Sequence, residues 1–240
     1  MSKIEWTEKT WNPITGCTKV SQGCKNCYAE SIAKRFWKDR KFTDIKFHED
    51  RLKQPLTWEK PSMVFVNSMS DLFHESISYF DLDTIFQIIW GTPRHIYQIL
   101  TKRPKRALEY FNTKSTPVHS NVWLGVSVEN QDTADERIPI LNKINAGIKF
   151  LSCEPLLEET ILNRLSFFEF NQSLIDWVII GAESGAKKRE CKIEWVESIV
   201  NQCKEENIKV FIKQLNIGGK IEKDIDKFPE HLRIREYPNK

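Results

Sequence analysis

The sequence is organised by short apolar runs that return about every thirty residues, each followed by a segment with helical periodicity. The runs cover residues 63–66, 95–100, 122–126, 148–151, 177–180 and 209–212. Helical patterns fall at about 81–90, 104–112, 131–144, 156–165 and 193–206. Strands that are apolar throughout and alternate with helices are typical of a parallel sheet buried on both faces. The sequence therefore predicts an α/β fold, and these strands with a short one near 4–11 predict a partial or irregular (β/α) barrel of the TIM type.

The chain is predicted to form one domain over residues 1–240, because α/β barrels commonly reach 240 residues without splitting. The segment 38–61, with Pro55 and Pro61 as breakers, is interpreted as an inserted loop. The N-terminus has no apolar signal core, and no run approaches the roughly 20 apolar residues of a membrane span. We expect a cytoplasmic protein with no membrane partner, whose six cysteines are ligands, catalysts or buried residues rather than disulfides.

Polar side chains stand where the predicted strands end. In a (β/α) barrel this edge of the sheet holds the active site. The residues are Asn67, Ser68, Met69, Ser70, Asp71, Thr101, Lys102, Arg103, Ser127, Glu129, Ser152, Cys153, Glu154, Glu183, Ser184, Lys213 and Gln214. The acids and bases among them could neutralise each other as buried pairs, bind a polar substrate or time a proton transfer, and the sequence does not separate these roles.

Three cysteines, Cys17, Cys24 and Cys27, follow the spacing C-x6-C-x2-C in the polar loop 16–27. A structural zinc ion requires four closed ligands, and the paired spacing that supplies them is missing here. Three thiolates suit a [4Fe–4S] cluster, whose open iron can chelate S-adenosylmethionine (SAM) and pass an electron to it. A zinc knuckle completed by a distant histidine and simple buried thiols are the alternatives.

The cysteine loop leads directly into a predicted amphipathic helix. Its apolar positions are Tyr28, Ile32 and Phe36, with Ala29, Ala33 and Trp37 beside them. Their i, i+4, i+8 spacing predicts one broad apolar stripe, which we interpret as core. Cys27 then lies near the N-terminus of the helix, where the helix dipole stabilises a thiolate.

Four further motifs carry a resemblance to a known family. They are the runs at 6–17, 124–130, 154–157 and 181–185. With the cysteines they resemble a family of phage and bacterial three-cysteine-motif proteins of unknown function, over residues 6 to about 214. The resemblance implies a radical-SAM-like protein, in which Cys17, Cys24 and Cys27 bind the [4Fe–4S] cluster and SAM is the second cofactor.

Resemblance to radical SAM barrels also assigns candidate SAM contacts. Asn67, Ser68, Met69 and Ser70 take the place of the segment that meets the methionine amino group. Ser127 and Glu129 match the polar residues at strand ends that hold ribose hydroxyls. Helix capping is an equal alternative for Glu129, because Asn130 and Asp132 open the next predicted helix.

The leading hypothesis is a radical SAM enzyme that splits SAM and abstracts hydrogen from a nucleotide, a modified nucleic-acid base or a partner protein. Cys153, Glu154, Glu183 and Lys102 are its candidate catalytic residues. Cys153 could return a hydrogen atom to a substrate radical, although free cysteine more often packs as a small apolar residue.

Two other classes of protein compete with this hypothesis. One is a binding module, stabilised by zinc or an iron–sulfur cluster, that acts through a partner protein without radical chemistry. The other is a TIM-type hydrolase with structural zinc. The net charge of +3 is too small to argue for nucleic-acid binding by itself. Basic clusters at 102–106 and 187–189 could meet a phosphate or be solvated turns.

Overall fold

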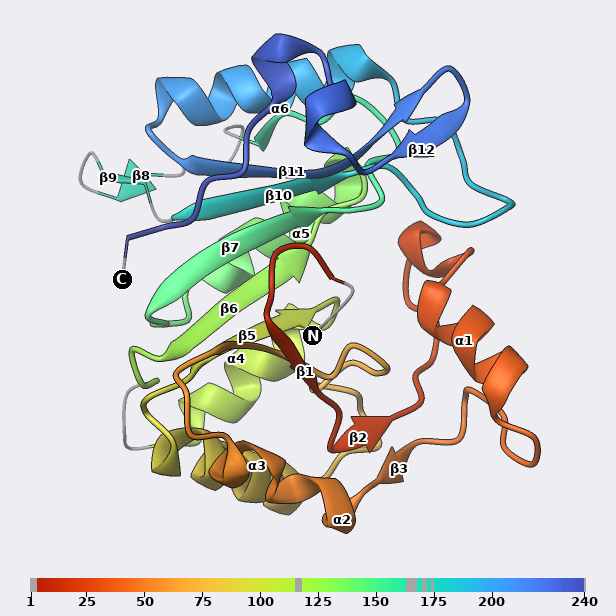
Figure 1. Cartoon of the computed structure of the whole chain (residues 1–240). Coiled ribbons are helices and arrows are strands. Elements are labelled where there is room, and N and C mark those ends of the chain that lie inside the picture. The colour runs from red at the N-terminus through yellow and green to blue at the C-terminus, as the bar shows by residue number, and fades with distance from the viewer. Residues whose placement is uncertain (1–3, 115–117, 163–167, 170–171, 174, 240) are drawn as a thin grey trace. The chain divides into compact units, whose positions relative to one another are not determined.

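The computed structural model describes residues 4–114, 118–162, 168–169, 172–173 and 175–239 of the chain (Figure 1). The chain has a mixed α/β fold with a mostly parallel sheet, whose strands follow the order β1-β4-β5-β6-β7-β10-β11-β12. Two compact units divide the chain: the first comprises Met1–Leu124 and Ile144–Gly147, the second Gly125–Lys143 and Ile148–Lys240. The boundary falls inside strand β6 (Val122–Ser127). Among the described residues, no helix is long and apolar enough to span a membrane.

The first unit is built on parallel strands. Its sheet contains β1 (Lys9–Trp11), β4 (Met63–Val66) and β5 (Ile96–Thr101), and then the first residues of β6. Lys9 pairs with Val64 and Met63 with Ile96, so that β1, β4 and β5 run parallel. Their carboxyl ends therefore meet at one edge, which is the edge that carries the cysteine loop.

Two helices of the first unit pack through aromatic side chains. They are α3 (Tyr79–Gly91) and α4 (Pro104–Asn112). Phe86 of α3 stacks on Tyr110 of α4 with ring centroids 5.3 Å apart, and meets Phe111 edge-on at 5.4 Å. The start of α3 is fixed by a capping box, in which Ser78 and Asp81 satisfy each other's backbone N–H groups.

The remaining elements of the first unit lie before β4. Strands β2 (Ile14–Thr15) and β3 (Lys46–Phe47) form an antiparallel pair. Helix α1 (Tyr28–Phe36) follows the cysteine loop, and the segment 38–61 contains β3, α2 (Glu49–Leu52) and the 3-10 helix η2 (Gln54–Thr57). The predicted insertion thus carries short elements that attach it to β2.

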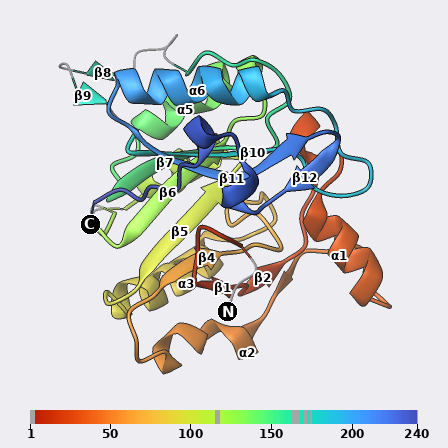
Figure 2. The same ribbon diagram turned by 45° about the horizontal axis from the view of Figure 1, so that its top comes forward.

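The second unit continues from β6 with three parallel strands and an antiparallel one. Strands β7 (Ile148–Cys153), β10 (Trp177–Gly181) and β11 (Lys209–Ile217) are parallel, and β12 (Lys220–Glu222) turns back against β11. Its helices are α5 (Gln131–Asn142) and α6 (Ile193–Glu205), and α6 lies along this part of the sheet in Figure 2. A short hairpin joins β8 (Phe168–Glu169) to β9 (Gln172–Ser173).

The predicted strands and helices are confirmed with one exception. All six apolar runs are strands of the sheet, and helices occur at four of the five predicted places. The helix predicted at about 156–165 is wrong over its described part, 156–162, which has no α-helix. The Leu156 N–H donates to the Gly181 carbonyl and the Leu157 N–H to the Glu129 carbonyl, so this backbone is bonded to strand ends instead of to a helical turn.

Candidate functional site

The cysteine loop is fixed at its first residues. The Gly16 N–H donates to the Met69 carbonyl and the Cys17 N–H to the Phe42 carbonyl, both at 2.9 Å. Gly16 has a φ of +98°, and a Cβ there would lie 2.5 Å from the Asp44 carbonyl oxygen, so only glycine fits. The loop then passes through the short 3-10 helix η1 (Gln22–Cys24) and ends at Cys27, the N-cap of α1. Cys17, Cys24 and Cys27 are all half-buried free thiols.

The segment 67–70, predicted to contact SAM, holds the start of this loop against the end of β4. Asn67 adopts a φ of +59°, which turns the chain away from the strand. The contacts between the two segments are Ile14 N to Asn67 Oδ1 at 3.3 Å, Ser68 Oγ to Asn12 Oδ1 at 3.1 Å, Met69 N to Asn12 Oδ1 at 3.0 Å and Ser70 Oγ to the Ile14 carbonyl at 3.0 Å. These polar atoms are thus engaged in positioning the cysteine loop.

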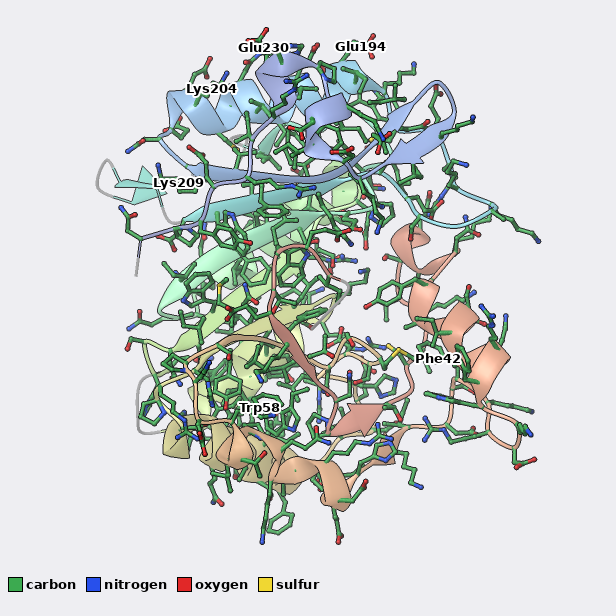
Figure 3. The ribbon with its side chains drawn as sticks, in the orientation of Figure 1. Phe42, Trp58, Glu194, Lys204, Lys209 and Glu230 are labelled. Atoms are coloured by element: carbon green, nitrogen blue, oxygen red, sulfur yellow. The ribbon has the colours of Figure 1, made fainter. Side chains whose placement is uncertain are left out.

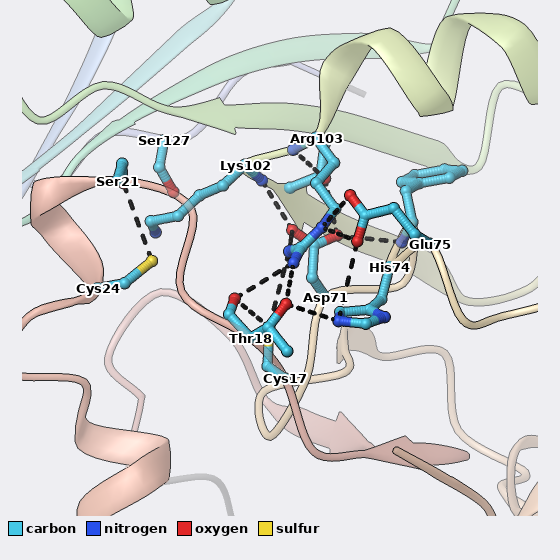
Figure 4. Close-up of polar contacts among 12 residues, drawn as sticks. Cys17, Thr18, Ser21, Cys24, Asp71, His74, Glu75, Lys102, Arg103 and Ser127 are labelled. Carbon is cyan, nitrogen blue, oxygen red and sulfur yellow. Dashed lines mark hydrogen bonds and ion pairs between the residues drawn. The ribbon is translucent and has the colours of Figure 1, made fainter. Parts of the chain in front are cut away.

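Arg103 is the centre of the polar network beside Cys17 (Figure 4). Its side chain is 5% exposed, and the residue lies two positions after the end of β5. All three guanidinium nitrogens donate hydrogen bonds. Nε donates to the Glu75 carboxylate at 2.8 and 3.0 Å, and Nη1 donates to Cys17 Sγ at 3.7 Å and to Asp71 Oδ2 at 3.3 Å. Nη2 donates to the Thr18 carbonyl at 3.2 Å and to Thr18 Oγ1 at 2.9 Å. One buried cation therefore joins the cysteine loop to the ends of β4 and β5.

Asp71 anchors this cation. Its Oδ1 accepts from Thr101 Oγ1 at 2.8 Å and from the Phe73 N–H at 3.0 Å. Its Oδ2 accepts from the Lys102 N–H at 2.9 Å and from Arg103. A buried carboxylate with four donors is fully satisfied, so Asp71 has the role of a support for Arg103 rather than of a free acid.

His74 closes the network on the side of Thr18. The Ser76 N–H donates to His74 Nδ1 at 3.1 Å, so the proton of the neutral ring is on Nε2, which lies 2.8 Å from Thr18 Oγ1 and donates to it. Burial lowers the pKa of His74, and the nearby Arg103 lowers it further. The ring is therefore neutral at pH 7 and holds the Thr18 hydroxyl in place.

The same surroundings act on the Cys17 thiol. Burial raises the pKa of Cys17 to about 11, and the Asp71 carboxylate raises it as well. Arg103 acts in the opposite direction through its charge and its hydrogen bond to the sulfur. Without a metal ion to replace the proton, Cys17 is a thiol at pH 7, and Arg103 is the group that favours its thiolate.

The three thiols of the cysteine loop are the ligand type that an iron–sulfur cluster takes, but their side chains do not converge on a common centre. Three free thiols share one loop, and the nearest further cysteine in the sequence is Cys153. The buried guanidinium of Arg103 can balance the negative charge of thiolate ligands. Across the described part of the chain, no three His, Cys, Asp or Glu side chains lie close enough together to hold a metal ion. Cys24 Sγ instead lies 3.8 Å from Ser21 Oγ.

Lys102 extends from the end of β5 toward the part of the loop that carries Ser21 and Cys24 (Figure 4). Its backbone N–H is held by Asp71 at 2.9 Å, which fixes the direction in which the side chain leaves the strand. Lys102 was predicted as a catalytic residue, and it lies on the cysteine side of the first unit. Its catalytic role stays a prediction.

In the second unit, Ser127 and Glu129 lie at the end of β6, where sequence reasoning predicted ribose contacts. The Glu129 carboxylate, 1% exposed, is paired with Arg137 Nη1 at 3.2 and 3.3 Å, and the same nitrogen donates to the Ser127 carbonyl at 2.8 Å. Helix α5 is capped by Asn130 and Thr133 rather than by the Glu129 side chain. Glu129 is therefore a member of a buried ion pair, and its role toward SAM stays a prediction.

Two other predicted acids of the second unit are also paired. Glu154 accepts from Lys213 Nζ at 2.5 Å, and both side chains are mostly buried. The Glu183 carboxylate accepts from Arg189 Nε at 2.9 Å and from Nη2 at 2.5 Å, and it also accepts from the Arg189 N–H at 2.9 Å. Each acid thus has a basic partner, which is the neutralising arrangement that the sequence left open.

Cys153 ends β7 and is completely buried. Burial raises its pKa well above the usual range, and Coulomb interactions with Cys203 and Glu129 act in the same direction. The residue therefore keeps its S–H bond at pH 7. Both packing and hydrogen-atom donation use a protonated thiol, so its catalytic role stays a prediction.

A family model described as "Protein of unknown function (DUF5131)" matches residues 1–236. The chain belongs to this family. Neither the search of curated proteins nor the search of solved structures gave a match. The match includes the cysteine loop and the strand ends of both units.

Sequence reasoning placed Asp71 and Arg103 among the polar strand ends of this DUF5131 chain. It assigned no role to Asp71, considered Arg103 only as part of a basic cluster, and missed Thr18, His74 and Glu75. The available signal was an arginine two residues after β5 and an aspartate five residues after the neighbouring strand β4. Such a pair at the edge of a parallel sheet is close enough for an ion pair. Its third partner, Cys17, is more than fifty residues away from either and could not be assigned by spacing.

Proposed function

We propose that this protein is a radical SAM enzyme, in which Cys17, Cys24 and Cys27 hold a [4Fe–4S] cluster and the substrate is a nucleotide, a modified nucleic-acid base or a partner protein. The observation that carries the proposal is the placement of three free, half-buried thiols on one loop that is bonded to the carboxyl ends of parallel strands. A partial (β/α) barrel is part of the proposal, and the mostly parallel sheet supports it.

The cofactor would supply what the side chains cannot. A [4Fe–4S] cluster with three cysteine ligands chelates SAM at its open iron and delivers the electron that cleaves it. The protein contributes the ligands, their charge balance and the shielding of the site. Arg103, which donates to Cys17 Sγ, would stabilise the thiolate form that a ligand requires.

The remaining assignments belong to each unit separately. In the first unit, the segment 67–70 positions the cysteine loop and would meet the methionine part of SAM, while Lys102 would act on the substrate. In the second unit, Ser127 and Glu129 would bind ribose, and Glu154, Glu183 and Cys153 would serve the substrate.

The test is anaerobic reconstitution with iron and sulfide, followed by incubation with SAM and a reductant. The proposal expects a brown protein absorbing near 400 nm, with about four irons per chain, that converts SAM to 5′-deoxyadenosine. A triple Cys17→Ala/Cys24→Ala/Cys27→Ala variant should lack both properties, and Cys191→Ala should keep them. A colourless protein with one zinc ion would favour the metal-stabilised binding module, and a cluster that leaves SAM intact would exclude radical SAM chemistry.

A further inference from the structure

The segment 34–42, at the end of α1 and just beyond it, carries an unusual density of positive charge. Five cations, Lys34, Arg35, Lys38, Arg40 and Lys41, stand against one acid, Asp39. The local net charge of +4 exceeds that of the whole chain, which is +3. We call the surface formed by this segment and by the exposed side chains of Tyr28, Ile32 and Phe36 the α1 surface.

The face of α1 that carries Tyr28, Ile32 and Phe36 is apolar and exposed, so the prediction that the stripe is core is wrong for these three residues. Phe36 is 66% exposed, Tyr28 45% and Ile32 40%, and their spacing places them on one face of the helix. The neighbouring row of the predicted stripe, with Ala29 and Ala33, is buried as predicted. Exposed aromatic side chains in a row are uncommon on a surface without a binding partner.

Cations and aromatic rings alternate on the α1 surface. The Arg40 guanidinium lies 3.7 Å from the centroid of the Trp37 ring, and that of Arg35 lies 5.3 Å from the Phe36 ring. Trp37 and Phe42 are a tilted pair with centroids 5.9 Å apart, and Phe42 is labelled on the loop after α1 in Figure 3. The surface therefore offers flat faces and positive charge at the same place.

The positive charge of this surface is only partly compensated within the protein. Lys34 pairs with Glu30 at 2.8 Å, and Arg40 Nη2 donates to Thr15 Oγ1 at 2.6 Å. Lys38 and Lys41 are exposed, and within the described ranges neither has an acidic side chain at salt-bridge distance. At least two cations thus remain for an anionic partner.

We propose that the α1 surface binds single-stranded nucleic acid. Phosphates would pair with Lys38 and Lys41, and unpaired bases would stack on Phe36 and Tyr28, because every base has a π-face while a duplex hides it. The Tyr28 hydroxyl donates to the Ser68 carbonyl at 2.6 Å, which fixes the ring in one orientation for stacking. The inference stands independently of the cluster and SAM, since none of its residues is an assigned ligand of either.

The test is fluorescence anisotropy of a labelled thymidine oligomer of about twelve nucleotides, titrated with the full chain at several salt concentrations. We expect the logarithm of the affinity to fall linearly with that of the salt concentration. Lys38→Glu/Lys41→Glu should weaken binding about tenfold or more and make the salt dependence shallower. Phe36→Ala, which removes an exposed ring and leaves the fold intact, should weaken it about fivefold or more.

Matched controls come from the same unit. Lys53→Glu/Lys60→Glu makes the same charge change on exposed lysines elsewhere, and Phe80→Ala removes a phenylalanine that is 78% exposed on α3. Both controls should bind like the wild type. The proposal is overturned by no binding at low salt, by equal losses in the controls, or by equal affinity for a duplex of the same length. Equal affinity for poly-glutamate, with no effect of Phe36→Ala, would overturn it in favour of an acidic protein partner.

Discussion

The two units treat the polar residues at their strand ends differently. In the second unit each of the three predicted acids has a basic partner: Glu129 has Arg137, Glu154 has Lys213 and Glu183 has Arg189. In the first unit a single arginine, Arg103, contacts two acids, a threonine and a cysteine sulfur. An ion pair between an acid and a base neutralises both charges, whereas a cation that also donates to a thiol favours the thiolate form of that thiol. The first unit is therefore the part of the protein whose strand-end network acts on a thiol.

Replacing the buried arginine of each unit should separate stability from thiol chemistry. Arg103→Met and Arg137→Met each leave a buried carboxylate without its cation, and each should lower the free energy of unfolding by about 3–5 kcal/mol in urea titrations. Only Arg103→Met should also slow alkylation of Cys17, because Arg103 favours the thiolate. Equal alkylation rates in the two variants would remove the special role of Arg103.

Two glycines with similar dihedral angles offer a second comparison. Gly16, before Cys17, has a φ of +98°, and Gly185, in the second unit, a φ of +102°. A Cβ at Gly185 meets nothing within 4 Å, so Gly185→Ala should cost only the backbone strain of roughly 1–2 kcal/mol. Gly16→Ala should cost at least about 1 kcal/mol more, because its Cβ meets the Asp44 carbonyl. Thermal and urea unfolding would measure both, and equal costs would show that the start of the loop is not fixed.

The negative charge of Asp71 should slow the alkylation of Cys17. Asp71→Asn removes the charge that raises the Cys17 pKa most after burial, so the pKa should fall below its value of about 11 and alkylation at pH 8 should become faster. The pH dependence of alkylation, followed by peptide mass spectrometry, resolves Cys17 from the other cysteines. A slower reaction in Asp71→Asn would contradict the direction of this effect.

Mild acid should destabilise the first unit more than the second. This effect should be smaller than the effects of the substitutions above. Burial lowers the pKa values of His48, His74 and His95, which all lie there. A lowered pKa means that the unfolded state binds protons first, so stability is complete above the usual histidine pKa of about 6.5 and is lost as the pH falls below it. Hydrogen exchange at pH 7 and pH 5, corrected for intrinsic rates, should show the larger loss of protection in the first unit. Equal losses in both units would argue against this placement.

The sequence predicts the strands of this protein well because each is an apolar run bounded by polar residues. It fails at α1, where periodicity shows that Tyr28, Ile32 and Phe36 share a face but not whether anything covers that face. It fails at 156–162 as well, where apolar residues such as Leu156 are buried although their backbone bonds to strand ends. Apolar spacing alone does not separate these two ways of burying a leucine.

The sequence also predicts the candidate site only in part. The rule that active residues follow parallel strands placed Asp71, Lys102 and Arg103 at the right edge, because strand direction is set by topology. The partners of these residues depend on how the cysteine loop folds back onto that edge, through Asn12, Gly16 and the segment 67–70. No local pattern in the sequence records such contacts between distant segments.

The most direct test of the account is the iron content of single cysteine variants after anaerobic reconstitution. Cys17→Ala, Cys24→Ala and Cys27→Ala should each lose the bound iron, while Cys191→Ala, in the second unit, should keep about four irons per chain. Full iron occupancy in any of the three loop variants, or an equal loss in Cys191→Ala, would contradict the assignment of the cysteine loop as a cluster site.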